Sequence, residues 1–351
     1  MKAKSKVLVA LSGGVDSSVA ATLLKRAGFN LVGVFMKFWQ EGDSVNRCCS
    51  VESAQRARRV AQKLDIPFYV LNVKSQFKKA IVDYFLQEYK AGRTPNPCVV
   101  CNKEIKFRFL IQKALELGCD FVATGHYARL EPQFPISNFQ FPKKILQAKC
   151  QQKDQTYFLW RLGQKEISKI IFPVGDYTKP EVRQIAKKFG LPTAQTPESQ
   201  EVCFIQGTTS DFLKKYLKTK QGNVIDGQGS VLGKHQGLWF YTIGQRKGLP
   251  LQQGPWFVVG KDFKKNILIV SKNERDLLQK QVFFNQVNWV SGRASVFPIK
   301  VKAKIRSKVP LADCLVYKNK AVFVMPQKAI TPGQSIVFYK KEELLGGGII
   351  C

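Results

Sequence analysis

The chain opens with a strand-like run, a short loop of glycine and serine, and a helical pattern. The run "KVLVAL" is followed by "SGGVDSS" and then by the helix-like "SSVAATLLKRAG". Backbone N–H groups and the helix dipole make such a loop an anion site, and its glycines let a phosphate approach without a Cβ in the way. No Gly-Lys-Ser/Thr follows, so the loop is not a Walker loop. We expect Asp16 to hold the Mg²⁺ that accompanies a polyphosphate.

Strand-like and helical segments continue to alternate as far as "CDFVATGH". This pattern predicts an α/β fold with right-handed crossovers and a doubly wound parallel sheet, whose ligands bind outside the carboxyl ends of the strands. The sequence "TGHYA" follows one of these strands, so Gly125 is expected to approach a bound nucleotide and His126 to reach toward a substrate. A histidine that only caps the strand end is the alternative for His126.

The sequence pattern changes twice in the rest of the chain. Short β-rich runs separated by Gly, Asn and Asp begin near residue 207, and closely spaced apolar runs typical of a small β-barrel begin near residue 280. We therefore expect a catalytic domain at residues 1–206, a small β-rich domain at 207–279 and a C-terminal β-barrel at 280–351.

The formal net charge is +31, which favours a polyanionic partner such as a nucleic acid. A lysine-rich surface that reflects genome bias is the alternative. In "IKVKAKIRSK" cations alternate with apolar residues, so a strand here would place five like charges on one face. Such a row repels itself unless a polyanion lies across it. The five cations are Lys300, Lys302, Lys304, Arg306 and Lys308.

The nine cysteines are an odd and scattered set. No apolar run of about 18 residues and no cleavage site of a secretion signal occurs, so the protein is expected to be soluble and cytoplasmic, without a membrane partner and with mostly reduced thiols.

Two of these cysteines form a CxxC pair in "RTPNPCVVCNKEIKF". The two prolines are expected to hold the chain in an extended turn that leaves both thiols accessible. Cys203 lies far along the chain in "ESQEVCFIQG". A zinc site would need a second CxxC or a histidine pair, and the chain has neither. The spacing alone leaves a metal ligand pair, a redox disulfide and a reactive thiol open.

Several motifs together resemble a known family. SGGVDSS is similar to the pyrophosphate loop of the N-type ATP pyrophosphatases, which cleave ATP between the α and β phosphates and adenylate a substrate. With "FMKFW", "TPNPCVVCN", "ATGHYA", "KDQTYFLWRL", "FPVGDYTKPEVR", "GLWFYTIGQRKGL" and "TPGQSIVFY", the chain resembles the bacterial-type tRNA-specific 2-thiouridylases from about residue 6 to residue 350.

The resemblance implies an ATP-dependent sulfurtransferase that thiolates the wobble uridine of tRNA, with a cysteine desulfurase or sulfur carrier as donor. Cys203 would carry the sulfur as a persulfide, and Cys101 would attack the bridging sulfur, leaving a transient Cys101–Cys203 disulfide. ATP would be bound by Ala10, Leu11, Ser12, Gly13, Gly14, Val15, Asp16, Ser17, Met36 and Gly125. The target base would meet Asn96, Pro97 and Cys98, and tRNA would meet His126, Lys153, Asp154, Gln155, Arg306, Ser307 and Gln334.

Cys98 departs from one branch of the family, which has Asp there, so a general-base role of that carboxylate does not carry over. An alternative is that Cys98, Cys101 and Cys203 bind an iron–sulfur cluster that delivers the sulfur. Two further alternatives are an adenylating ligase with a small substrate, which would need neither the two cysteines nor a basic barrel, and an RNA-binding or redox CxxC protein, which would not need SGGVDSS.

Overall fold

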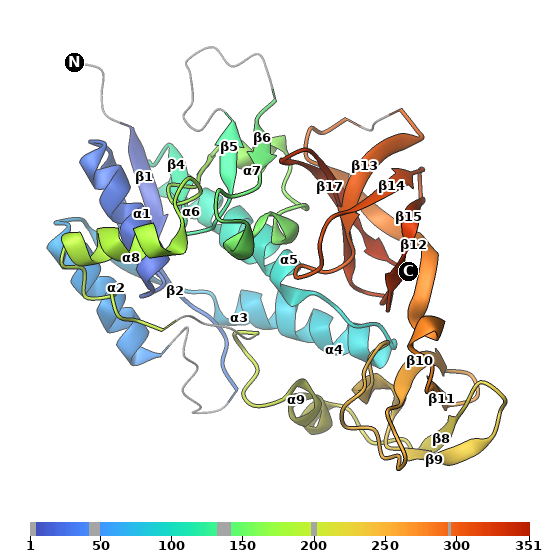
Figure 1. Ribbon diagram of the computed structural model, residues 1–351. Coiled ribbons are helices and arrows are strands. Elements are labelled where there is room, and N and C mark those ends of the chain that lie inside the picture. The colour runs from blue at the N-terminus through green and yellow to red at the C-terminus, as the bar shows by residue number, and fades with distance from the viewer. Residues whose placement is uncertain (1–4, 42–49, 132–141, 198–201, 294–295) are drawn as a thin grey trace.

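The computed structural model describes residues 5–41, 50–131, 142–197, 202–293 and 296–351. The strands form three sheets, and Figure 1 shows them as three parts of the molecule. The parallel sheet lies on the left, the C-terminal barrel at the upper right and the small sheet below the barrel. Among the described residues, no helix combines the length and the apolar character needed to cross a membrane.

The N-terminal sheet has five parallel strands in the order β3-β2-β1-β4-β7. Val7 and Val9 of β1 pack with α1 and α2 on one face, and Leu8 packs with α6 on the other. Both faces are therefore covered, which confirms the predicted doubly wound parallel sheet. These elements are β1 (Lys6–Ala10), β2 (Asn30–Lys37), β3 (Phe68–Asn72), β4 (Phe121–Ala123), β7 (Ile170–Ile171), α1 (Val15–Arg26), α2 (Val51–Lys63) and α6 (Leu110–Glu116).

Helices between β3 and β4 fill the centre of the molecule, as Figure 1 shows for α3, α4 and α5. Two stretches are π-helical, and the second begins directly after Cys101. π-helical turns are rare in proteins, and those that do occur often lie at functional sites. The elements are α3 (Lys74–Phe77), η1 (Lys78–Val82), α4 (Asp83–Lys90), α5 (Pro97–Cys101) and η2 (Asn102–Phe109).

The structure corrects the extended turn predicted around the CxxC pair. Pro97 begins helix α5, where its missing N–H costs nothing, and Asn96 is the N-cap residue. Cys98 is exposed, as expected, but Cys101 is only 6% exposed. The prediction of two accessible thiols is therefore wrong for Cys101, because a helix turns position 101 toward the interior.

The C-terminal sheet closes on itself, since β12 pairs with both β15 and β17. Val301 and Ala303 of β13 face the core, as the alternating pattern predicted. However, β13 ends at Lys304, so the predicted row of five cations on one strand face is wrong for Arg306 and Lys308, which lie beyond the strand. Two short strands from the first part of the chain, β5 and β6, extend this sheet through β17. The barrel strands are β12 (Leu278–Trp289), β13 (Ile299–Lys304), β14 (Ala312–Val316), β15 (Lys320–Lys328), β16 (Ser335–Lys340) and β17 (Glu343–Ile350), joined by β5 (Arg129–Glu131) and β6 (Lys144–Leu146).

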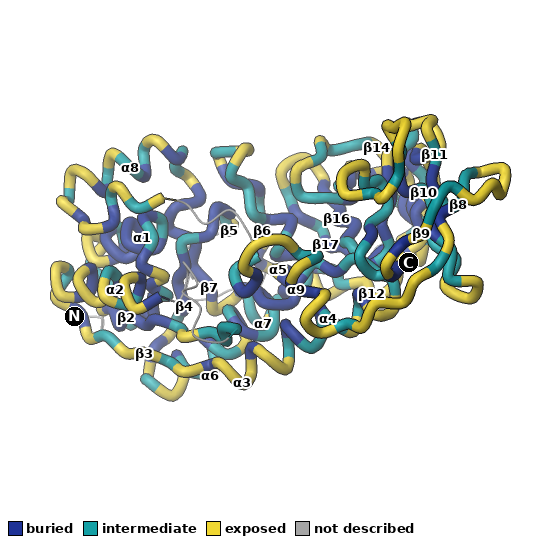
Figure 2. The backbone as a smooth tube through the Cα atoms, turned by 90° about the horizontal axis from the view of Figure 1, so that it is seen from below, coloured by how far each residue is buried: buried dark blue, intermediate teal, exposed yellow. Residues whose placement is uncertain are grey.

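The small third sheet and several short helices complete the fold. Figure 2 shows buried backbone in the parallel sheet and again in β16 and β17, with α5 between them. A four-stranded sheet of order β10-β11-β8-β9 forms the small part. The remaining elements are η3 (Gln151–Lys153), η4 (Thr156–Phe158), α7 (Gln164–Ile167), α8 (Lys179–Lys188), α9 (Thr209–Tyr216), β8 (Gly222–Ile225), β9 (Val231–His235), η5 (Leu238–Phe240), β10 (Phe257–Asp262), β11 (Ile267–Ser271) and η6 (Glu274–Leu277).

Candidate active site

Hydrogen bonds with two serines of the first turn of α1 hold the loop between β1 and α1 in place. Ser17 Oγ and Ser18 Oγ donate to Gly14 O at 3.1 and 2.9 Å, and Ser12 N donates to Ser17 Oγ at 3.2 Å. Gly13 has a φ of +75°, and a Cβ there would lie 2.3 Å from Ser53 O of α2. A side chain at this position would therefore push α2 away from the loop.

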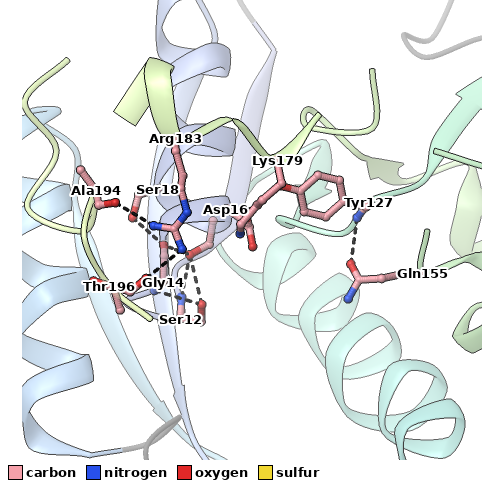
Figure 3. A network of polar contacts seen from close by, with 11 residues as sticks. Ser12, Gly14, Asp16, Ser18, Tyr127, Gln155, Lys179, Arg183, Ala194 and Thr196 are labelled. Carbon is pink, nitrogen blue, oxygen red and sulfur yellow. Dashed lines mark hydrogen bonds and ion pairs between the residues drawn. The ribbon is translucent and has the colours of Figure 1, made fainter. Parts of the chain in front are cut away.

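A carboxylate, an ammonium group and a phenol meet beside this loop. Asp16 Oδ1 accepts hydrogen bonds from Tyr127 Oη at 2.8 Å and from Lys179 Nζ at 2.6 Å (Figure 3). The Lys179 side chain is 10% exposed and that of Asp16 is 31% exposed. The arrangement places a nearly buried cation next to the first turn of α1, which suits a site for a polyphosphate. Binding of Mg²⁺ by Asp16 stays a prediction.

The loop after β4 lies against the same turn of α1. A Cβ on Gly125 would be 2.6 Å from Ser17 N, so this position has room only for glycine. Because β1 and β4 are parallel neighbours, both loops leave the carboxyl edge of the sheet, as the sequence predicted. Met36, near the end of β2, lies at the same edge and packs against the aromatic cluster described below.

His126 is buried rather than presented to solvent. Its ring packs against those of Phe107 and Phe172, and Nδ1 shares a hydrogen bond of 2.8 Å with Thr124 Oγ1. Burial holds the pKa of His126 well below its usual value, so the imidazole is neutral at pH 7. These contacts describe a residue that supports the loop, and a direct contact with tRNA stays a prediction.

Two of the predicted tRNA residues beside η3 bond to the protein's own backbone. Gln155 Oε1 accepts from Tyr127 N at 2.8 Å, and Asp154 Oδ1 accepts from Ala148 N at 3.0 Å. Lys153 is half-buried at the end of η3. Through Gln155, the segment 153–155 therefore helps to hold Tyr127 in place next to Asp16. Its contact with tRNA stays a prediction.

A core cluster that contains the rings of Phe77, Phe85, Tyr89, Phe204 and Phe212, here called the aromatic cluster, brings two of the predicted cysteines together. Cys101 belongs to this cluster, and Cys203 packs against it beside the fully buried Phe204. Phe204 makes edge-on ring contacts with Phe77 and Phe85, at centroid distances of 5.9 and 5.3 Å. The structure thus places in one apolar environment two thiols whose residues are more than a hundred positions apart in the sequence. Residues 198–201, which precede Val202 and Cys203, lie outside the described part of the chain.

The barrel reaches the loop that carries the predicted target-base residues. Gln334 Nε2 donates to Thr94 O at 2.8 Å, two residues before Asn96. Arg306 donates to Ala329 O and, at 3.0 Å, to Thr331 Oγ1. Ser307 is half-buried beside it. The predicted target-base and barrel residues are therefore neighbours.

No group of three His, Cys, Asp or Glu side chains suited to a metal ion occurs within the described ranges. Cys98 lies exposed on α5, whereas Cys101 is buried in the aromatic cluster. The three-cysteine cluster thus gains no support from these positions and stays a prediction.

Sequence reasoning missed four residues that shape the site. Lys179 and Tyr127 bond to Asp16; Arg56 Nε donates to Gly13 O at 3.1 Å; and Arg183 Nη1 donates to Ala194 O at 2.9 Å. Lys179 did carry a signal. It begins a helix, where the macrodipole disfavours a cation, so a lysine there suggests a nearby negative group.

Family models match almost the whole chain. A tRNA methyl transferase HUP domain matches residues 5–207, a tRNA methyl transferase PRC-barrel domain matches 210–272 and an aminomethyltransferase β-barrel domain matches 279–350. Among solved structures, a 4-thiouridine synthetase in complex with RNA and ATP is 18% identical, with a TM-score of 0.37, over 55% of this chain and 43% of that one.

Curated relatives match over nearly their full length. The tRNA-specific 2-thiouridylase MnmA of Clostridioides difficile is 43% identical over 98% of both chains. The protein of the same name from Geobacillus thermodenitrificans is 44% identical over 99% of this chain and 95% of its own. This chain therefore belongs to the tRNA-specific 2-thiouridylase family.

Proposed function

We propose that this protein replaces the C2 oxygen of the wobble uridine of tRNA with sulfur, in a reaction driven by ATP. The observation that carries the proposal is the combination of two sites in one family member. The glycine–serine loop with the adjoining Asp16–Lys179 ion pair suits a polyphosphate, and Cys101 and Cys203 both pack in the aromatic cluster. An adenylating ligase for a small substrate would need the first site but not the second.

The loop side of the site would activate the base. A uracil C2 carbonyl is a poor electrophile with a poor leaving group, and transfer of AMP to its oxygen supplies a good one. The glycine loop and the first turn of α1 would cradle the phosphates, while Lys179 would neutralise charge that develops as pyrophosphate departs. Asp16, released from Lys179, would then be available to a magnesium ion.

The thiol side would deliver the sulfur. The terminal sulfur of a Cys203 persulfide attacks C2 and AMP leaves, giving a Cys203–S–S–C2 adduct. The Cys101 thiolate then attacks the Cys203 sulfur, and the electron pair of the broken S–S bond passes to the sulfur on C2. The products are 2-thiouridine and a Cys101–Cys203 disulfide, which an external dithiol must reduce. A cysteine desulfurase or sulfur carrier would reload Cys203.

The test is thiolation of an unmodified tRNA transcript with ATP and a persulfide donor, followed on a mercury-containing gel. Cys101→Ser and Cys203→Ser should each abolish the thiolated product, whereas Cys351→Ser, at an exposed position directly after β17, should leave it intact. Full turnover by either of the first two variants would remove that cysteine from the mechanism. Pyrophosphate release that does not depend on tRNA would favour the small-substrate ligase.

Cys98 separates the persulfide route from a cluster route. Cys98→Ser should still give the thiolated product if the sulfur travels on Cys203, because in that route Cys98 only meets the target base and takes no part in the exchange above. Loss of activity together with an anaerobic absorption band, iron and labile sulfide in the purified protein would show that a cluster carries the sulfur.

A further inference from the structure

Strand β3 forms one edge of the parallel sheet, and no other strand in the described part of the chain pairs with its outer side. Its sequence, FYVLN, contains neither a charged residue nor a proline, which are the residues that commonly protect such an edge. Tyr69 and Val70 are 47% and 46% exposed, and Figure 2 shows β3 at the margin of the molecule. This edge is therefore accessible to a further strand.

The register with β2 identifies the backbone groups on the outer edge of β3. Gly33 N donates to Pro67 O at 2.8 Å, and Val73 N donates to Lys37 O at 3.1 Å. The register between these two bonds is unbroken. In a parallel ladder, every second residue of a strand bonds to the same neighbouring strand. The residues that direct their N–H and C=O groups away from β2 are therefore Phe68, Val70 and Asn72.

A pocket of about 400 Å³ lies beside the start of β3, next to Tyr69. Two of its lining residues are lysines whose ammonium groups bond to backbone oxygens. Lys6 Nζ donates to Leu117 O at 2.8 Å, and Lys25 Nζ donates to Asp65 O at 3.0 Å. Asp65 is the one acidic residue of the lining, so the pocket has an excess of positive charge.

Further cations lie along β3 and at its other end. The Arg58 guanidinium lies over the Phe68 ring, 5.4 Å from its centroid, and Lys74 begins helix α3 two residues after the strand. Within the described ranges, neither cation forms an ion pair with a carboxylate, and the same holds for Lys6 and Lys25. Cations without a counter-charge favour a partner that carries carboxylates.

The backbone groups and the cations together select the kind of partner. An extended peptide presents alternating N–H and C=O groups, so it can pair with the edge of a sheet. RNA phosphates would match the cations, but a phosphate donates no hydrogen bond and would leave the outward C=O groups unpaired. A second copy of this chain would match the edge, but it would bring the same cations face to face.

We propose that the outer edge of β3 binds an extended, acidic segment of a partner protein, which adds a sixth strand to the sheet. Carboxylates of this segment would pair with Lys6, Lys25, Arg58 and Lys74. Leu71 of β3 packs against the aromatic cluster, so the partner would lie on the side of the molecule that holds the two thiols. The proposal does not depend on the proposed function.

A synthetic peptide tests the edge in the full-length protein. The probe has the sequence Glu-Val-Thr-Val-Glu-Val-Glu and is blocked at both ends. At millimolar concentration it should slow hydrogen exchange at the amides of Phe68, Val70 and Asn72, followed by mass spectrometry with single-residue resolution. The same peptide with Lys in place of each Glu should bind at least about tenfold more weakly in fluorescence anisotropy, because it presents like charge to the cations.

Val70→Pro removes one outward N–H and leaves the bonds to β2 in place, because proline is accepted in an edge strand where the N–H faces solvent. Affinity for the acidic peptide should fall at least about tenfold. Val70→Thr keeps the N–H and the branched side chain and should stay within about twofold. The melting temperature and ATP affinity serve as controls for folding.

Lys74→Glu provides a test that leaves the strand unaltered. A glutamate is favourable in the first turn of a helix, so this variant should fold. Affinity for the acidic peptide should fall severalfold, whereas Lys187→Glu, at an exposed position on α8, should leave it unchanged.

Several outcomes would overturn the proposal. The first is exchange at the three amides that the acidic peptide does not slow. The second is equal binding of the acidic and basic peptides, and the third is unchanged affinity in folded Val70→Pro. Dimerisation of the unaltered protein that is lost in Val70→Pro would assign the edge to a second copy. Protection of these amides by an anticodon stem-loop but not by the peptide would assign it to RNA. Because the peptide assays involve no sulfur transfer, their result holds even if the proposed function fails.

Discussion

The two ends of the candidate site differ in the polarity of their side chains. At the loop end, Asp16, Lys179 and Tyr127 form a compact set of charged and polar groups around α1. At the thiol end, Cys101 and Cys203 lie among aromatic rings such as Phe204 and Phe85. Figure 3 shows the first end, where side chains from several segments converge on the start of α1.

The difference matches the two halves of the proposed chemistry. Departure of pyrophosphate develops negative charge, so that step needs fixed positive groups. Attack by a persulfide competes with attack by water, so that step needs an environment from which water is excluded. Substitutions at the loop end should therefore lower the reaction rate more than the free energy of unfolding. Substitutions in the aromatic cluster should lower both.

Lys179→Met should produce the largest effect. Removing the cation beside α1 should slow tRNA-dependent pyrophosphate release roughly a thousandfold, equivalent to about 4 kcal/mol on the barrier. Lys188→Met, at the exposed end of the same helix, is the matched control and should stay within about twofold. Because the barrel is expected to hold tRNA, retention of tRNA at low salt should survive in Lys179→Met. Unimpaired pyrophosphate release would show that Lys179 only supports Asp16 structurally.

Phe204→Ala should cost about 3 kcal/mol of unfolding free energy, because a fully buried ring next to Cys203 would leave a cavity. Urea unfolding followed by circular dichroism measures this loss. Phe263→Ala, at a half-exposed ring, should cost much less. A similar loss in the two variants would contradict the view that the thiol end depends on packing.

Local patterns predicted most of the parallel sheet and the loop beside it. Strand and helix periods, with glycines at Gly13 and Gly125, are properties of neighbouring residues, so the sequence contains them directly. The alternation at Val301 and Ala303 likewise predicted the inner face of β13.

Contacts between distant segments could not be predicted in the same way. Lys179 lies 163 residues from Asp16, and Gln334 lies 240 residues from Thr94, so no local pattern pairs them. The burial of Cys101 was misjudged for a different reason. The two prolines were expected to extend the chain, but Pro97 occupies the first turn of a helix, where proline is favoured.

The buried histidines should make stability depend on pH. Burial lowers the pKa of His126, so the unfolded chain binds more protons than the folded one below the usual histidine pKa of about 6.5. The unfolding free energy should therefore fall as the pH drops, by about 2 kcal/mol between pH 7 and pH 5 for a histidine that stays neutral when folded.

His126→Phe should remove that part of the pH dependence, measured by urea unfolding at several pH values. His235, whose pKa burial also lowers, should retain its own part in this variant. A pH profile that is unchanged in His126→Phe would show that His126 is protonated in the folded protein.

The smallest effect is expected from the outer face of the barrel. Lys300 and Lys302 are exposed, and the pair of Lys302 with Asp313 at 3.0 Å is open to solvent on both sides. Lys300→Gln with Lys302→Gln should lower the slope of log Kd against log salt for tRNA by about one to two, with ATP affinity unchanged. Lys187→Gln with Lys188→Gln removes the same charge from exposed positions on α8, far from the barrel in Figure 1, and should leave the slope unaltered. Equal slopes in the two double variants would mean that total charge, rather than the barrel face, attracts the tRNA.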